Sequence, residues 1–316
     1  MRVPVPLPTM GRPHFMMLHS ISDAAQCGRA SHCKAGTLAG LLAAALLFAL
    51  QTTASAESEI PVRPGPTASL AEIEACVTQN LPDAAGVIDF GVEAVDRTGV
   101  VSASRAEIRW RKDAAELSQI ILRVSEPAKT AGTALLIIDR ELEQPEFFLR
   151  LPELDKVRRV RSKRLRGPVL GTDFSYEDLD RLRDPLDRKS LDLIGISDVE
   201  GRPSWLLETL PDPKDGSEYA RVLTQVDQDT CLPIRIDLYG EDDVLRKRLH
   251  APIAEIRSVG TSSGKSMLPH VFVMEDLRRE THTVIRIRRF ESSDDLPEAQ
   301  FTKRGLQEPP PAAVTR

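Results

Sequence analysis

The sequence has little of what many enzymes and nucleotide-binding proteins use at their sites. Aromatic residues make up 4% of its 316 residues, and only two of them are tryptophans. It has no H-E-x-x-H motif and no phosphate-binding glycine loop. The histidines after residue 57 are His250, His270 and His282, and no two of them have the spacing of metal ligands. These absences argue against a zinc protease and a nucleotide-dependent enzyme, and we expect no metal, no cofactor and no catalytic residues.

Long hydrophobic runs are also scarce. Only one is present, residues 38–50, and a membrane-spanning helix needs about 20 apolar residues. Basic residues precede this run and Ala54-Ser55-Ala56 follows it, which predicts a cleaved secretory signal over residues 1–56. An uncleaved membrane anchor is the alternative. We therefore expect an exported protein.

The part that remains after cleavage lacks an excess of positive charge and has few cysteines. Residues 57–316 hold 38 basic and 46 acidic residues, a net charge of −8, which argues against a nucleic-acid partner. Only Cys76 and Cys231 remain, an even number in an exported chain. This favours a disulfide between them over two free thiols. No C-x-x-C remains, so a thiol redox enzyme is not indicated.

Alternation of apolar and polar residues dominates the chain from residue 87 to residue 290. The segments AEIRWR, PIRIDLYG and HTVIRIRRF show it most clearly, and each would place apolar side chains on one face of a strand. This is typical of an antiparallel sheet with one face in water. Ser69 and Glu72 form a capping box that starts a helix. We expect a mainly β (α+β) fold of roughly nine to eleven strands and few helices, a curved sheet or open barrel.

Composition divides the rest of the chain. Residues 57–69 are rich in proline and predict a flexible leader, and residues 306–316 predict a disordered proline-rich tail. Residues 70–305 would form the barrel domain.

The stretch GTDFSYEDL, residues 171–179, allows three interpretations. A calcium loop would need glycine at the sixth position counted from Asp173, where the chain has Asp178. Asp173 with Glu177 or Asp178 could instead form an acid–base pair for hydrolysis. The third interpretation is a helix start, with Ser175 as N-cap and Asp178 at the third helical position. It explains most of the residues, so we favour a structural corner. Its residues are Gly171, Asp173, Phe174, Ser175 and Tyr176.

A longer segment that includes this corner, residues 147–179, resembles the signature of the bacterial outer-membrane lipoprotein-sorting-protein family. Members of this family are periplasmic relatives of the LolA and LolB lipoprotein carriers. The matching elements are an apolar strand ending in LPEL, the step VRRV, a basic loop with a glycine, and GTDFSYEDL. Two further segments, ACVTQNLP and VDQDTCLPIRIDLY, resemble the cysteine-bearing segments of the same family.

The resemblance implies a LolA-like incomplete antiparallel β-barrel, covered by a few helices, around an apolar cavity. It implies a periplasmic, non-enzymatic carrier of lipid or lipoprotein acyl chains toward the outer membrane. A partnership with an inner-membrane exporter of the resistance–nodulation–division type is also implied. The alternative is an accessory subunit of an inner-membrane lipid exporter without mobile cargo. Eight apolar residues on alternating strands are the expected cavity lining: Phe147, Leu149, Leu151, Ile234, Ile236, Leu238, Ile285 and Ile287.

A basic run precedes the corner. It is either a solvated strand and loop or a docking patch for anionic headgroups or an acidic partner. Its residues are Arg158, Arg159, Arg161, Lys163, Arg164 and Arg166.

Overall fold

The computed structural model describes residues 65, 67–80, 85–141, 143–154, 156–160, 166–183, 185–186, 190–212, 214, 216–262, 264–293 and 296–308. The predicted signal, most of the predicted leader and residues 309–316 lie outside the described residues. So do three members of the basic run, Arg161, Lys163 and Arg164. In the described part of the chain, no helix is both long and apolar enough to cross a membrane.

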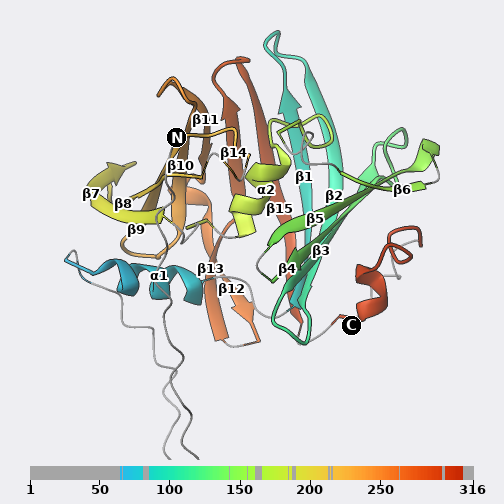
Figure 1. Ribbon diagram of the computed structural model, residues 1–316, viewed down its shortest axis with the longest axis horizontal. Coiled ribbons are helices and arrows are strands. Elements are labelled where there is room, and N and C mark those ends of the chain that lie inside the picture. Colours follow the sequence, from blue (N-terminus) through green and yellow to red (C-terminus); the bar gives the residue numbers. More distant parts are fainter. Residues whose placement is uncertain are drawn as a thin grey trace, which may run out of the picture. The chain divides into compact units, whose positions relative to one another are not determined.

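Thirteen strands form one antiparallel sheet in the order β6-β5-β4-β3-β2-β1-β15-β14-β11-β10-β9-β8-β7 (Figure 1). Their bounds are β1 Ala85–Val95, β2 Val101–Lys112, β3 Ser118–Glu126, β4 Ala134–Arg140, β5 Glu143–Leu151, β6 Lys156–Arg159, β7 Leu191–Val199, β8 Arg202–Thr209, β9 Arg221–Asp227, β10 Pro233–Tyr239, β11 Leu245–His250, β14 Val271–Asp276 and β15 Thr281–Ser293. A separate hairpin is formed by β12 Ile256–Thr261 and β13 Gly264–Pro269. The helices are α1 Leu70–Gln79 and α2 Tyr176–Arg183, with 3₁₀ turns η1 Pro152–Leu154, η5 Ile253–Glu255 and η6 Glu298–Phe301.

The prediction of a mainly β fold with few helices is confirmed, but the predicted strand count is wrong. The described residues form fifteen strands, thirteen of them in one sheet. Some of the strands are short and carry no apolar alternation; β6 reads KVRR and β12 reads IRSVGT. Cross-strand pairing with a longer neighbour creates such strands, and a single-sequence pattern does not reveal it.

The main sheet does not close into a barrel, and its two edge strands differ in chemistry. β6 is four residues long, and three of the four are basic. Short, charged edges resist the addition of another strand. β7 is nine residues long and exposes Leu193, Ile194 and Ile196. Within the described residues, β7 pairs only with β8.

Strands β1 and β15 join the two ends of the chain at the middle of the sheet. They are paired over eleven residue pairs, from Ala85 opposite Ser293 to Val95 opposite His282. The two faces of β1 separate by chemistry, because Phe90 and Val92 are buried on one side while Asp89 bonds to Arg105 on the other (2.9 Å). We call the side with Phe90 and Val92 the inner face and the opposite side the outer face.

Helix α1 covers the inner face of β8 and β9 at one end of the sheet. Ser69 and Glu72 form the expected capping box. The helix buries Ile73 and Val77 against Trp205 and other side chains of these strands. Next to them, Cys76 forms a disulfide with Cys231, and their Cα atoms are 5.6 Å apart. The predicted disulfide is therefore present.

The outer face of β3–β6 is covered by the C-terminal segment, residues 296–308. Phe301 and Leu306 are buried there against Ile121, Leu136 and Phe148. Leu306 belongs to the segment expected to be a disordered tail, so the packed part of the chain extends beyond residue 305.

The disulfide should contribute strongly to stability, because it closes a loop with a sequence separation of 155 residues. We expect reduction to lower the free energy of unfolding by up to about 5 kcal/mol. Urea denaturation with and without reductant measures this. The Cys76→Ser/Cys231→Ser variant is the control, since reductant should leave its unfolding curve unchanged. Two reactive thiols in the unfolded, unreduced protein would contradict the disulfide.

Candidate functional site

The inner face is apolar across nine neighbouring strands, from β5 to β10. Residues directly opposite each other in an antiparallel pair share a face, so the strand register defines the rows of this surface. One row runs through Leu149, Leu135, Leu122, Ile108, Ile88 and Phe290. Two others run through Val92, Ile285 and Phe272, and through Met274, Leu249 and Ile236.

Helix α2 and the corner before it lie across this face (Figure 1). Phe174 is buried in a cluster with side chains of β9–β11 and β14. Tyr176 is buried against Phe147 of β5, with ring centroids 5.4 Å apart in an edge-to-face arrangement. Leu179 packs against both clusters. One short helix therefore bridges the two halves of the sheet.

This bridging requires the sheet to curve. β5 and β11 are seven steps apart in the strand order. In a flat sheet they would be separated by about 34 Å, at roughly 4.8 Å per step. Helix α2 has eight residues and is therefore about 12 Å long. Since α2 contacts Phe147 of β5 and Lys247 of β11, the inner face is concave around it.

Local hydrogen bonds explain why the chain turns at GTDFSYEDL. Gly171 has a positive φ of 80°, which favours glycine. Asp178 accepts from the backbone N–H of Ser175 (2.7 Å), and Ser175 Oγ accepts from the backbone N–H of Asp178 (3.1 Å). The helix start indicated by the sequence is therefore present. Asp173 is tied to β15, because its carboxylate accepts from the hydroxyls of Thr281 and Thr283.

Asp178 anchors the same corner to β11, two strands further along the sheet from β15. Its carboxylate forms an ion pair with Lys247 (2.7 Å), and the two side chains are 1% and 4% exposed. The hydroxyl of Tyr219 donates to the second carboxylate oxygen (2.7 Å). Burial raises the pKa of Tyr219 well above its ordinary value of 10.0, and the charge of Asp178 adds to this shift. Glu177, the third acid of the stretch, pairs with Arg181 (3.3 Å) and accepts from the backbone N–H of Glu218 (3.0 Å). All three acids are thus occupied by structural bonds.

The predicted lining residues divide into covered and open positions. Seven of the eight lie on inner-face rows. Phe147, Ile236 and Leu238 are buried under the corner, whereas Leu149, Leu151, Ile285 and Ile287 are partly exposed. Ile234 is buried in a different cluster, with Val199 and Leu232.

Between the covered regions, the middle of the inner face keeps partly exposed aliphatic side chains. We call this set the open patch: Ile88, Ile108, Ile120, Leu122, Ile285 and Ile287. The first four are not among the residues predicted to line the cavity. The alternation in AEIRWR contains Ile108, and VIDFGV has a similar pattern around Ile88, so the signal was present.

Trp110 marks one end of this surface. Its ring lies over Gly86, where a Cβ would come within 2.3 Å of the indole, and it packs near Phe290 with centroids 6.0 Å apart. Gly86 therefore provides the space that lets the indole approach the backbone of β1.

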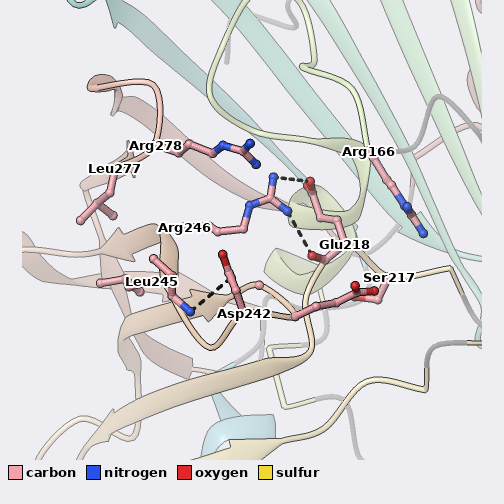
Figure 2. A pocket seen from close by; sticks show the side chains of 11 residues that line it. Arg166, Ser217, Glu218, Asp242, Leu245, Arg246, Leu277 and Arg278 are labelled. Atoms are coloured by element: carbon pink, nitrogen blue, oxygen red, sulfur yellow. Dashed lines mark hydrogen bonds and ion pairs between the residues drawn. The ribbon is translucent and has the colours of Figure 1, made fainter.

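The described part of the basic run is divided between two places. Arg158 and Arg159 are on β6, and Arg159 pairs with Glu146 (3.2 Å). Arg166 instead donates to the backbone of Gly216 (2.8 Å) and helps line a pocket of about 790 Å³ (Figure 2).

This pocket has many charged side chains in its wall and does not match the dry slot expected for acyl chains. It lies beside the β10–β11 and β14–β15 turns, and the dashed lines in Figure 2 include the contact of Arg246 with Glu218 (3.3 Å). Its wall combines three arginines and three acids with a few aliphatic groups: Arg166, Ser217, Glu218, Gly240, Glu241, Asp242, Val244, Leu245, Arg246, Leu277 and Arg278.

Residues 260–264 read GTSSG, which matches the G-x-S-x-G pattern of hydrolase nucleophiles. In those enzymes the pattern forms a turn from a strand into a helix. Here Gly260 and Gly264 flank the turn of the β12–β13 hairpin, so the required local structure is missing.

Comparison with solved structures identifies the class of fold. A putative outer membrane lipoprotein-sorting protein domain from Vibrio parahaemolyticus has a TM-score of 0.67 and 19% identity, covering 75% of this chain and 97% of that one. A DUF1329 family protein from Desulfovibrio piger has a TM-score of 0.67 and 21% identity, covering 74% of this chain and 96% of that one. A LolA superfamily protein from Nitrosomonas europaea has a TM-score of 0.58 and 17% identity, covering 74% of this chain and 98% of that one. The fold is LolA-like, which confirms the resemblance found in the sequence.

A protein-family model described as "Uncharacterized protein" matches residues 116–308. The match covers more than half of the chain, and the chain belongs to this family. No curated protein matches the chain.

The buried ion pair should control the stability of the corner. We expect Asp178→Ala to lower the free energy of unfolding by up to about 3–5 kcal/mol, because the buried Lys247 would keep only its longer ion pair with Glu218 (3.7 Å). Urea denaturation measures the change. The double variant Asp178→Leu/Lys247→Met removes both charges and should recover much of the loss. A double variant as unstable as the single one would show that the ion pair is not the cause.

Tyr219 should make stability fall at alkaline pH. Its pKa is raised in the folded protein, so the unfolded chain loses the phenol proton first. Stability is therefore full below about pH 10 and decreases as the pH rises above it. Tyr219→Phe should show a smaller decrease between about pH 9 and pH 11 in denaturant titrations. Tyr239→Phe is the control. If both variants reduced the alkaline loss of stability equally, Tyr219 would not be its specific cause.

Proposed function

We propose that the chain is an exported carrier that binds the acyl chains of a lipid or lipoprotein on the inner face of its sheet. Transfer toward the outer membrane is part of this proposal. The observation that carries it is the open patch. Each CH₂ group kept in water costs about 0.8 kcal/mol, so a concave aliphatic surface and an acyl chain both gain by mutual burial. The LolA-like fold supports this proposal.

The corner would determine how much cargo the inner face accepts. The open patch borders the clusters that hold Phe174 and Tyr176. A short acyl chain would lie on the patch beside α2. A longer chain would have to displace α2, which is anchored to β15 through Asp173 and to β11 through Asp178. Release of these anchors would therefore accompany loading of long chains.

Several features support binding rather than catalysis. Asp173 and Asp178 are bonded to hydroxyls, a backbone N–H and an ammonium group. Glu177 is bonded to Arg181 and to the backbone N–H of Glu218. These bonds argue against a role for the three acids as general acid or base. The disulfide between Cys76 and Cys231 suits an oxidising compartment outside the cytoplasm. We place the carrier in the periplasm, exported by a cleaved signal.

Two further expectations belong to this proposal. The basic run before the corner would serve as a docking patch for anionic headgroups or for an acidic partner, and Arg158 and Arg166 are exposed members of it. An inner-membrane exporter of the resistance–nodulation–division type would be the partner that supplies cargo. Arg158→Glu with Arg166→Glu should then weaken delivery without changing acyl binding.

The second candidate is an accessory subunit that binds a lipid exporter and carries no mobile cargo. It is favoured by the packing under the corner, because Phe147, Ile236 and Leu238 are already buried by the chain itself. A face filled in this way leaves less room for a ligand. The carrier requires the open patch to be large enough to bind an acyl chain, whereas the accessory subunit has no such requirement.

Uptake of a fluorescent fatty-acyl probe by the protein tests the carrier. We expect Ile287→Glu to weaken binding at least about tenfold, because the carboxylate would lose its hydration or admit water to the patch. Arg286→Glu is the control: it places the same carboxylate one residue away, on the outer face, where Arg286 is exposed, and it changes the net charge more than Ile287→Glu does. Its binding should stay close to wild type.

Circular dichroism and thermal unfolding must accompany this measurement. Ile108→Glu, on the neighbouring part of the patch, is a second variant if Ile287→Glu does not fold. A folded wild-type protein that takes up no acyl probe would reject the carrier and leave the accessory subunit. Equal weakening by Arg286→Glu would show that charge, and not the patch, governs binding.

A further inference from the structure

The free edge of β7 lies at one end of the main sheet, and within the described residues this strand pairs only with β8. It exposes Leu193, Ile194 and Ile196, whose side chains are 37%, 48% and 57% exposed. Edge strands are often protected by short length, basic side chains or proline, because their unpaired backbone groups can bind another strand. β6, at the other end of the sheet, has the first two of these features, whereas β7 has none of the three.

The turn after β7 determines which backbone groups face this edge. Its two central residues, Glu200 and Gly201, both have a positive φ (52° and 81°), as a type I′ hairpin turn requires. The residues that flank such a turn, Val199 and Arg202, exchange backbone hydrogen bonds. Hydrogen-bonded and non-hydrogen-bonded pairs then alternate along the antiparallel ladder.

This alternation assigns the next residues of β7. Asp198 is opposite Pro203 and Ile196 is opposite Trp205, and both are non-hydrogen-bonded positions. Pro203 agrees with the assignment, because proline has no N–H to donate to β7. The backbone N–H and C=O groups of Ile196 and Asp198 therefore point away from β8, toward the free edge.

The part of β7 that carries these groups is held in its strand conformation. Val199 is buried in a cluster that Ile253 packs against, and Glu200 accepts from the backbone N–H of Ile253 (3.2 Å). The register shift between Leu193 and Gly195 limits the regular part of the edge to the residues after it. An edge that is fixed before binding loses little conformational entropy when another strand pairs with it.

This part of the edge is also acidic. Asp198 and Glu200 are exposed, and residues 190–201 contain no Arg or Lys. Arg202, the first residue of β8, is already paired with two acids of β9 and the turn after it (2.7 and 2.9 Å). Asp198 and Ile196 lie on the same face, because alternate residues of a strand share a face. The edge thus presents an aliphatic group and a carboxylate two residues apart.

A second copy of the chain fits this edge poorly. If two β7 strands paired antiparallel about Gly195, Asp192 of each copy would lie opposite Asp198 of the other. If they paired about Ile196, Asp192 would lie opposite Glu200 instead. Like charges directly opposite each other destabilise a strand pair. The charges therefore favour a basic strand from a different protein.

We propose that residues 195–199 of β7 bind an extended, basic segment of another protein by strand addition. Backbone hydrogen bonds with Ile196 and Asp198 would supply the affinity. The segment would add antiparallel, as every other strand of the sheet does. It would place an apolar side chain opposite Ile196 and, two residues away, a lysine or arginine opposite Asp198. The site does not depend on acyl binding by the inner face.

Fluorescence anisotropy of a labelled synthetic peptide with the protein, residues 57–316, tests this. The peptide alternates valine with threonine and carries lysine at both ends, and a second peptide carries glutamate in place of lysine. We expect the lysine peptide to bind at least about tenfold more tightly. Ile196→Pro should weaken its binding by a similar factor, because it removes an N–H that faces the free edge. Proline is tolerated at such a position, so the variant should fold.

Asp198→Asn is a second variant, which keeps the oxygen that accepts from the N–H of Gly201 (2.8 Å) but removes the charge. It should weaken binding of the lysine peptide by roughly threefold. Asp192→Asn is the matched control, since it makes the same change at an exposed acid of β7 on the other side of the register shift. Its binding should stay close to wild type. All variants should still take up the fatty-acyl probe.

Hydrogen exchange locates the peptide. The amides of Ile196 and Asp198 should become protected when it binds, whereas that of Ser197, which faces β8, should be protected already. Failure of wild-type protein to bind, equal binding of the two peptides, or protection elsewhere would overturn the proposal. A wild-type dimer that Ile196→Pro dissociates would identify a second copy as the occupant instead.

Discussion

The arrangement of the sheet depends on the buried carboxylate of Asp178. It forms an ion pair with the ammonium group of Lys247 and accepts hydrogen bonds from the hydroxyl of Tyr219 and from a backbone N–H of its own corner. These bonds compensate for the burial of a charged group. With the bonds of Asp173 to β15, this fixes a short helix against strands that a flat sheet would hold far apart. The curvature of the inner face, the burial of Phe174 and the extent of the open patch all follow from where this helix is held.

The same anchoring divides the inner face into a part that the chain itself covers and a part that stays open to solvent. Under the corner, the chain covers its own apolar side chains, which stabilises the fold. In the middle of the sheet, aliphatic groups stay partly in water, and the free energy lost there is the free energy a ligand could recover. A protein that bound acyl chains tightly by exposing the whole inner face would have little left to hold its sheet curved.

Much of the fold was accessible from sequence because its signals are local. The alternation in AEIRWR predicts β2, that in HTVIRIRRF predicts β15, and the capping pairs at Ser69 and Ser175 mark both helix starts. The candidate site was less accessible. Ile236 and Ile287 have the same strand alternation, yet one is buried beneath Phe174 and the other is not. That difference comes from the contact of Asp178 with Lys247, 69 residues away, and no local pattern encodes it. Leu306 shows the same limit, because a proline-rich neighbourhood suggested disorder where β3 and β5 offer a packing surface.

The unequal edges of the sheet limit how these molecules can polymerise. A strand from another molecule could add beside β7, which is long and apolar, but not readily beside the short, basic β6. Joining β7 of one molecule to β7 of another would leave only β6 at both ends of the combined sheet. Growth would then stop at a pair, and a continuous fibril, which needs two different edges that fit each other, could not form by this route.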